Sequence, residues 1–215
     1  MINITEDVTA VAERIHEMRK SQPRCLVAIS GAPGSGKSTF AAEIARRLNL
    51  QKCPALVVPM DGFHLDNTIL AERGLTNRKG APETFDAAGF IYLVRRLKTG
   101  AEAFAPTFDR VRDISIAGAI EVPAECPVIL FEGNYLLLDE SPWTDLAALW
   151  DLTICMNVPT QELRARLIQR WLSHNLSRAA ATRRAESNDI PNARRVIKHA
   201  LPAQMTFGVE PHKEE

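Results

Sequence analysis

Residues 27–48 read VAISGAPGSGKSTFAAEIARRL, in which an apolar run, a glycine-rich turn and an amphipathic segment follow one another. The turn satisfies the pattern G-x-x-x-x-G-K-[ST], whose backbone amides surround phosphate oxygens. A strand before the turn and a helix after it are the context that the motif requires. The sequence therefore predicts a site for nucleotide phosphates. The residues assigned to it are Gly31, Ala32, Pro33, Gly34, Ser35, Gly36, Lys37, Ser38 and Thr39.

The last residues of this motif carry its chemistry. Lys37 is expected to reach the outer phosphates of the nucleotide, and the Ser38 hydroxyl to ligate Mg²⁺. The helix that begins near Gly36 adds the positive end of its dipole to the same place. We therefore predict ATP and Mg²⁺ as the cofactors.

Apolar runs and helix-period segments alternate along the chain, which favours an α/β fold with a parallel sheet. The predicted strands are nearly continuous apolar runs, as expected where both faces of a sheet are covered; they lie at 25–30, 55–60, 127–133 and 152–158. The predicted helices lie at 5–20, 37–48, 87–98 and 161–171. Between them, 61–85 and 103–123 are expected to form loops over the site, with a hairpin around DISIAGAIEVP, and the polar tail after Gly208 is expected to fray.

The composition limits the classes of function. The chain has 215 residues, which suits a single domain over 1–215. Its 26 basic and 26 acidic residues give a formal net charge of +0, so a general attraction to nucleic acid is absent and no nucleic-acid partner is expected. No apolar run is long enough to cross a membrane, and a cytoplasmic protein without membrane insertion is expected. Four cysteines beside apolar runs are predicted to be reduced core residues: Cys25, Cys53, Cys126 and Cys155.

Two acids follow apolar runs, where parallel sheets build their sites. Asp61 comes directly after VVPM, and Glu132 ends PVILFE. Asp61 is predicted to take the proton from a substrate hydroxyl or to hold Mg²⁺ through water, and Glu132 to lie near the magnesium of the nucleotide.

A basic segment near the C-terminal end suggests a lid. Residues 164–195 hold eight arginines and only two acids, Glu186 and Asp189. Such a local positive surface suits a flap, at about 160–190, that closes over phosphates and stabilises the charge of the transferred group. Arg166 and Arg170 are the arginines favoured for this catalytic role, and SHNLSRAA is the expected hinge.

Five ordered motifs together carry a resemblance: GAPGSGKST, PMDGFHLDN, RKGAPETFD, PTFDR and FEGNYLLLDESPW. This set resembles the P-loop kinases grouped with uridine kinase, pantothenate kinase and phosphoribulokinase, and among them most the bacterial proteins named fructose transport system kinases. The likeness runs from about 23 to 201. It implies the three-layer P-loop nucleoside triphosphate hydrolase fold, with a parallel, mainly five-stranded sheet and a helical lid.

The resemblance also implies roles for single residues. Asp61 matches the general base of the family, Lys37 its P-loop lysine, and Ser38 and Glu132 positions around magnesium. The residues implied to bind the acceptor are His64, Arg78, Glu83, Phe85, Asp109 and Arg110. The sequence has Phe108 and Asp113 where uridine kinase reads its pyrimidine with an aromatic hydroxyl and a histidine, which does not favour uracil.

These observations lead to one expectation with two alternatives. The chain is expected to be an ATP- and Mg²⁺-dependent phosphotransferase that acts on a hydroxyl of a small metabolite, a sugar or sugar-like alcohol first. Pantothenate or a nucleoside is the alternative acceptor. The second alternative is a nucleotide-dependent regulator of a transport system, which would need a protein partner. A homodimer is left open beside a monomer.

Overall fold

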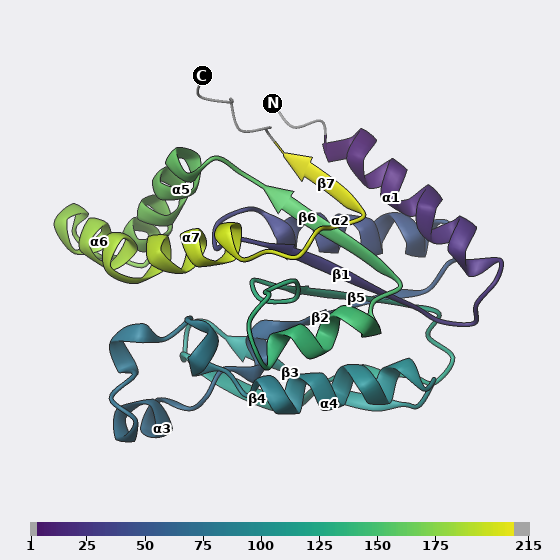
Figure 1. Ribbon diagram of the computed structural model, residues 1–215, viewed down its shortest axis with the longest axis horizontal. Helices are drawn as coiled ribbons and strands as arrows, with labels where there is room; N and C mark the ends of the chain where they lie inside the picture. The colour runs from purple at the N-terminus through teal and green to yellow at the C-terminus, as the bar shows by residue number, and fades with distance from the viewer. Residues whose placement is uncertain (1–3, 209–215) are drawn as a thin grey trace.

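The computed structural model describes residues 4–208, so the tail that was predicted to fray after Gly208 lies outside the described residues. Its centre is a parallel sheet in the order β2-β5-β1-β6-β7. The strands are β1 (Cys25–Gly31), β2 (Ala55–Pro59), β5 (Val128–Gly133), β6 (Leu152–Asn157) and β7 (Met205–Gly208). This arrangement confirms the predicted α/β fold with its five-stranded sheet (Figure 1).

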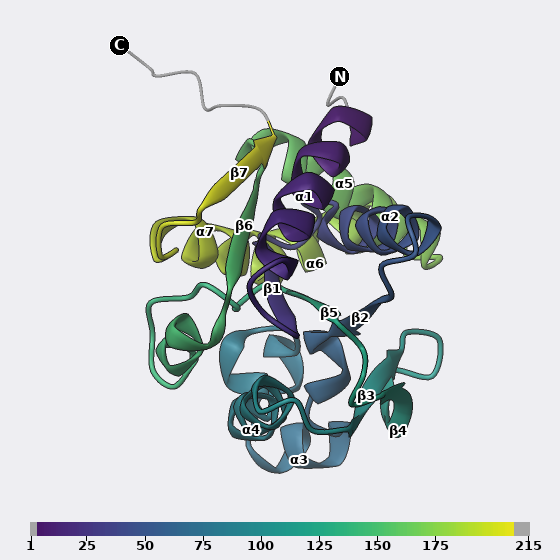
Figure 2. The same ribbon diagram turned by 90° about the vertical axis from the view of Figure 1, so that its right-hand side faces the viewer.

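Helices cover both faces of the sheet and make three layers (Figures 1 and 2). On one face, α1 (Ile4–Arg19) and α2 (Lys37–Leu50) bury apolar side chains such as Ile15 and Phe40 against β1 and β6. On the other face, α4 (Ala87–Lys98) and η4 (Trp143–Leu149) pack Phe90 and Trp143 against β5. Burial on both faces explains why the central strands are continuous apolar runs.

A helical arm extends beyond the carboxyl ends of the strands (Figure 1). It consists of α5 (Thr160–Ser173), α6 (Arg178–Arg184), the π-helical turn η5 (Ala185–Asp189) and α7 (Ile190–Lys198). Its apolar core, which includes Leu163 and Leu167, packs on Ala32 of the phosphate-binding loop. The arm thus matches the predicted lid, with α7 continuing past the predicted end at about 190.

Below the arm lies the middle of the chain, which is more regular than the sequence indicated. The stretch DISIAGAIEVP, around which a hairpin was expected, contains one strand, β4 (Ile114–Val122), which pairs with β3 (Ala103–Asp109) in a separate antiparallel hairpin. Short helical segments fill the rest of this region: η1 (Met60–Phe63), α3 (Asn67–Glu72), η2 (Thr76–Arg78) and η3 (Pro82–Thr84).

Two strands were not predicted. β3 contains Pro106 at a register shift between Ala105 and Thr107, and proline weakens a strand signal. β7 is a four-residue strand at the edge of the sheet, too short for a periodic pattern. All four cysteines are free thiols, two buried and two partly buried, as expected for reduced core residues. Over residues 4–208, none of the helices combines the length and apolarity that a bilayer crossing needs.

Candidate active site

The phosphate-binding loop joins the end of β1 to the start of α2. Gly34 and Gly36 have φ angles of 82° and 90°, a left-handed conformation that favours glycine. A Cβ atom at Gly31 would lie 2.6 Å from Ser35 Oγ, so the loop can close only with glycine there. Ser35 is buried and its Oγ has no hydrogen-bond partner within residues 4–208. The loop therefore has the shape and the free polar groups of a phosphate cradle.

Sheet order brings the two predicted acids to this loop. β5 lies between β1 and β2, so that Glu132 is in register with Ile29 of β1 and with Pro59 of β2. Asp61 lies within η1, just after the end of β2. Because the carboxyl ends of parallel strands share one edge, Asp61, Glu132 and Lys37 converge there.

The charges of these three groups are interdependent. Burial lowers the pKa of Lys37, although the nearby carboxylates of Glu132 and Asp61 favour its charged form. Burial likewise raises the pKa of Glu132 above its ordinary value, against the opposing charge of Lys37. A partly buried cation close to the buried Glu132 and the partly buried Asp61 forms a polarised site that an anionic, metal-bound ligand can complete.

The oxygen ligands at this edge fit a magnesium ion. The side chain of Ser38 is near enough to Glu132 to lower the pKa of its carboxyl, against the larger effect of burial, so a hydroxyl and a carboxylate lie side by side at the mouth of the loop. Across residues 4–208, no three His, Cys, Asp or Glu side chains gather into a metal-binding cluster. Mg²⁺ commonly takes one or two protein oxygens and completes its shell with phosphates and water. Ser38 and Glu132, with Asp61 nearby, would hold the metal in this way.

Asp61 is held by two neighbours. Arg110 Nη2 donates to Asp61 Oδ2 at 2.5 Å, and His64 Nδ1 donates to the Asp61 backbone oxygen at 2.7 Å. Burial raises the pKa of the Asp61 carboxyl, but the charges of His64, Arg110, Lys37 and Arg170 outweigh it and leave this pKa below its ordinary value. Asp61 is thus a carboxylate at neutral pH, as a proton acceptor must be.

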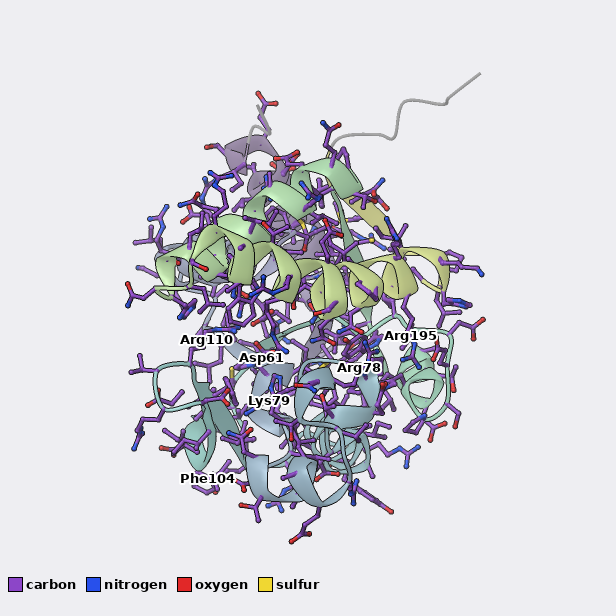
Figure 3. The ribbon with its side chains drawn as sticks, turned by 90° about the vertical axis from the view of Figure 1, so that its left-hand side faces the viewer. Asp61, Arg78, Lys79, Phe104, Arg110 and Arg195 are labelled. Atoms are coloured by element: carbon purple, nitrogen blue, oxygen red, sulfur yellow. The ribbon has the colours of Figure 1, made fainter. Side chains whose placement is uncertain are left out.

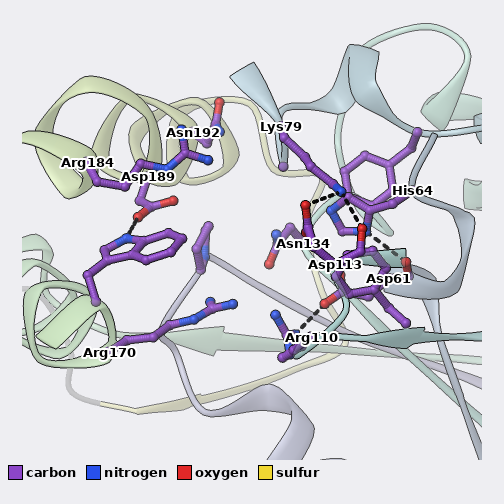
Figure 4. Close-up of a pocket in the computed structure, with 15 residues that line it drawn as sticks. Asp61, His64, Lys79, Arg110, Asp113, Asn134, Arg170, Arg184, Asp189 and Asn192 are labelled. Atoms are coloured by element: carbon purple, nitrogen blue, oxygen red, sulfur yellow. Dashed lines mark hydrogen bonds and ion pairs between the residues drawn. The ribbon is translucent and has the colours of Figure 1, made fainter. Parts of the chain in front are cut away.

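Next to Asp61 a pocket opens between the lid and the middle of the chain (Figure 4). The His64 ring lies between the rings of Phe85 and Phe108, with centroids 4.1 and 4.5 Å away. Of the residues predicted to bind the acceptor, His64, Phe85 and Arg110 line this pocket, and so does the lid residue Arg170.

The other three predicted acceptor residues do not line it. Asp109 accepts hydrogen bonds from the backbone amides of Val111 and Arg112, so its carboxylate shapes the turn of the hairpin. Glu83 pairs with Arg195 of α7 at 3.0 Å and Arg78 donates to Asn188 and Asn192. Figure 3 shows Arg78 and Arg195 beside the lid. Asp109, Glu83 and Arg78 therefore contact other parts of the protein and do not line the pocket.

The two predicted lid arginines face the phosphate loop. Arg166 Nη1 donates to the Gly34 carbonyl oxygen at 3.1 Å and also pairs with Glu162. Arg170 lines both the pocket at the loop and the pocket beside Asp61, and burial lowers the pKa of its guanidinium. Arg164 instead pairs with Glu186 inside the lid.

Several pocket residues were not among the predicted site residues. They include Lys79, Asn134, Trp171, Arg184, Asp189 and Asn192. Asp113 and Phe108, which the sequence indicated only as residues that do not favour uracil, line the pocket as well. Lys79 lies within the motif RKGAPETFD, so the sequence could have indicated it as a pocket residue. Asp189 ends the π-helical turn, and such turns often occur at functional sites, but its position next to Trp171 depends on how the lid folds.

Comparisons with known proteins agree with this geometry. The model of the Phosphoribulokinase / Uridine kinase family matches residues 26–199. A crystal structure from Silicibacter sp. TM1040, provisionally named a fructose transport system kinase, is 53% identical with a TM-score of 0.89, covering 94% of this chain and 98% of that one. A Schizosaccharomyces pombe protein that is provisionally named a uridine kinase is 38% identical over 87% of this chain and 84% of its own length. The pantothenate kinase of Myxococcus xanthus is 30% identical over 68% of this chain, which corresponds to 49% of that enzyme.

Proposed function

The chain belongs to the phosphoribulokinase/uridine kinase family and is a P-loop kinase, and on this premise we propose that it transfers the γ-phosphate of ATP to a hydroxyl of a small metabolite, a sugar or sugar-like alcohol first. The whole of 1–215 would act as one kinase domain with a lid. ATP is the phosphate donor that the family implies, and Mg²⁺ would neutralise the phosphate oxygens when bound.

The observation that carries this proposal is the position of Asp61 between two pockets. One pocket is lined by the phosphate loop, including Lys37 and Ser38, and the other by the aromatic group around His64. Both are lined by Asp61, Arg110 and Arg170. A group that has to align an acceptor hydroxyl with a γ-phosphate belongs at such a junction.

In the proposed reaction, Asp61 accepts the proton of the acceptor hydroxyl while the hydroxyl oxygen attacks the γ-phosphorus. The bond between that phosphorus and the β–γ bridging oxygen breaks, and ADP leaves. Lys37 holds the outer phosphates, and Arg170 stabilises the negative charge that spreads over the transferred group.

The lid excludes water from this reaction. Asn188 Nδ2 donates to the Lys79 carbonyl oxygen at 2.8 Å and Arg184 Nη1 to the Asn77 carbonyl oxygen at 3.3 Å, so the lid lies on the segment across the pocket. Closure of this kind limits the transfer of phosphate to water.

Two other functions are supported less well. Pantothenate or a nucleoside as acceptor is favoured by the relatives of those names, but Phe108 and Asp113 at the pocket are poorly suited to reading uracil. A nucleotide-dependent regulator of transport would need no second pocket beside the phosphate loop, and this chain has one.

The test is a search for the product. The purified protein is incubated with Mg²⁺-ATP and a panel of sugars, polyols, pantothenate and nucleosides, and mass spectrometry identifies any acceptor heavier by one phosphoryl group. The expected result is one class of phosphorylated acceptor. Its rate of formation should fall at least about 100-fold in Asp61→Asn, because a positioned general base contributes this much. Asp66→Asn, which changes an exposed N-cap of α3, is the control. ADP formation without any phosphorylated acceptor would favour the regulator.

A further inference from the structure

The cations of the site divide between its two pockets. Lys37 and Arg166 line the phosphate-loop pocket alone, and Arg110 and Arg170 line both pockets. Arg184 lines the acceptor pocket and its outer extension but is absent from the lining at the phosphate loop. The acceptor pocket therefore has a cation that the nucleotide does not account for.

Two of the four lysine and arginine side chains that line the acceptor pocket already have an acidic partner. Lys79 pairs with Asp113 at 2.9 Å and Arg110 with Asp61 at 2.5 Å. Arg170 and Arg184 do not, because no carboxylate within residues 4–208 lies at ion-pair distance from either guanidinium. Arg170 also lines the phosphate-loop pocket, which leaves Arg184 as the unpaired cation of the acceptor pocket alone. The one hydrogen bond of the Arg184 guanidinium is the contact with the Asn77 carbonyl. Four of the five N–H groups of a guanidinium thus remain for a ligand or for water.

Asp189 lies close enough to Arg184 to interact with its charge, but its carboxylate hydrogen-bonds to a different group. Asp189 Oδ2 accepts a hydrogen bond from Trp171 Nε1 at 2.5 Å. The Arg184 guanidinium lies 5.3 Å from the centre of the Trp171 ring, and Arg170 lies 5.8 Å from the same ring. The indole thus holds Arg184 in place by a cation–π contact without neutralising it. A cation that is fixed but not paired is prepared for an anion.

Arg184 also lies at the right end of the pocket. Figure 4 shows Arg184 and Asp189 on the side of the lid, across the pocket from Asp61 and Arg110. An acceptor whose hydroxyl meets Asp61 would extend its far end toward Arg184. The outer extension of the pocket is lined by Arg184, His174 and the paired side chains of Lys79 and Asp113, so that, within the described part of the chain, Arg184 is its one cation without an acidic partner besides Arg170.

From these contacts we infer that the acceptor carries an anionic group, a carboxylate or a phosphate, at the end remote from the reacting hydroxyl, and that Arg184 binds this group. This inference rests on the proposed kinase function and narrows its substrate class. A neutral sugar would leave the Arg184 donors to water alone, whereas an oxyanion accepts two parallel hydrogen bonds from one guanidinium.

Matched pairs of acceptors test the charge alone. Two carboxylate pairs are glycerate with glycerol and pantothenate with pantothenyl alcohol, and a phosphate pair is a pentulose 5-phosphate with the free pentulose. We expect kcat/KM to be about tenfold or more higher for the anionic member of at least one pair, because a charge-assisted hydrogen bond stabilises the bound acceptor by that much. Comparing the carboxylate with the phosphate pairs distinguishes the two anions.

The variant Arg184→Gln keeps hydrogen-bond donors but removes the charge. It should reduce the preference for the anionic member by about tenfold or more, mainly through KM. Arg183→Gln, at an exposed neighbouring position of α6, is the matched control and should leave the preference unchanged. Equal use of both members by the wild type, or an unchanged preference in Arg184→Gln, would overturn the inference while leaving the kinase proposal intact.

A binding measurement separates the two proposals if no acceptor is phosphorylated. The full chain is saturated with Mg²⁺ and a non-hydrolysable ATP analogue, and the same pairs are titrated by calorimetry. Tighter binding of anionic members that Arg184→Gln weakens would support the anion site although the kinase proposal had failed. Equal or no binding of both members would overturn the anion site itself.

Discussion

Arg110 Nη2 and Asp61 Oδ2 lie 2.5 Å apart, so the proposed base is joined to an arginine that follows β3. The Arg110 side chain is 47% exposed and that of Asp61 19% exposed, so the pair lies at the pocket surface. The guanidinium helps to keep Asp61 ionised and occupies one of its oxygens. Since both residues line both pockets, their pairing affects the acceptor and the phosphate alike.

The variant Arg110→Gln should therefore change the pH dependence of the reaction. Loss of the positive charge raises the pKa of Asp61, because the carboxylate form loses one of the charges that favour it. The acidic limb of a kcat/KM profile should move to higher pH than in the wild type, since Asp61 acts only when deprotonated. Arg112→Gln, which removes an exposed arginine from the same hairpin, is the control. An acidic limb at the same pH in both proteins would show that Arg110 does not tune the base.

Removal of the P-loop lysine should act on the nucleotide first. Lys37 lies close to Glu132 and Asp61, and Lys37→Ala takes a nearby positive charge from both acids. We expect ATP affinity to fall by about tenfold or more and turnover to fall with it, because a charged contact to the outer phosphates is lost. Calorimetry with Mg²⁺-ATP measures the affinity, with the exposed Lys20→Ala as control. Unchanged affinity would count against the assignment of the phosphate cradle.

A structural prediction concerns Arg24, which directly precedes β1, at the end of the strand opposite the phosphate-binding loop. Its buried guanidinium donates to five backbone oxygens: those of Leu97, Ala101, Pro123, Ala124 and Cys126. Arg24→Met would leave these acceptors unpaired, and the free energy of unfolding should fall by about 3 kcal/mol. Denaturant titration measures this loss, and Arg14→Met, at an exposed position of α1, should change it little. A loss below about 1 kcal/mol would contradict this role.

The parts of the site that local patterns determine were predictable. The loop between Gly31 and Ser38 and the acids at Asp61 and Glu132 follow apolar strands, and the parallel sheet then brings strand ends together without further information. The arginine-rich segment 164–195 indicated the lid, and the resemblance to known kinases supplied the loop that contains Phe85.

The rest depends on contacts between distant segments. Asp109 and Arg110 are neighbours in sequence, yet Arg110 reaches Asp61 while Asp109 binds its own turn, and no motif distinguishes these directions. Asp113 pairs with Lys79 because its φ of 56° turns the chain there, a conformation that is rare outside glycine. Arg184 reaches the pocket only because the lid folds over the segment 77–79.

Asn134 gives a prediction about how the acceptor is positioned. It follows β5 directly, lines both pockets, and its buried Oδ1 has no hydrogen-bond partner within residues 4–208. A buried oxygen without a hydrogen-bond partner is destabilising unless a ligand or water donates to it, so we expect a second hydroxyl of the acceptor, distinct from the one that reacts at Asp61, to donate to Asn134 Oδ1. Asn134→Ala should raise the acceptor KM by about tenfold, with ATP affinity within about twofold. The variant Asn134→Asp keeps an oxygen at this position, so it separates the loss of the oxygen from the loss of side-chain volume. An unchanged acceptor KM in Asn134→Ala would show that Asn134 does not contact the acceptor.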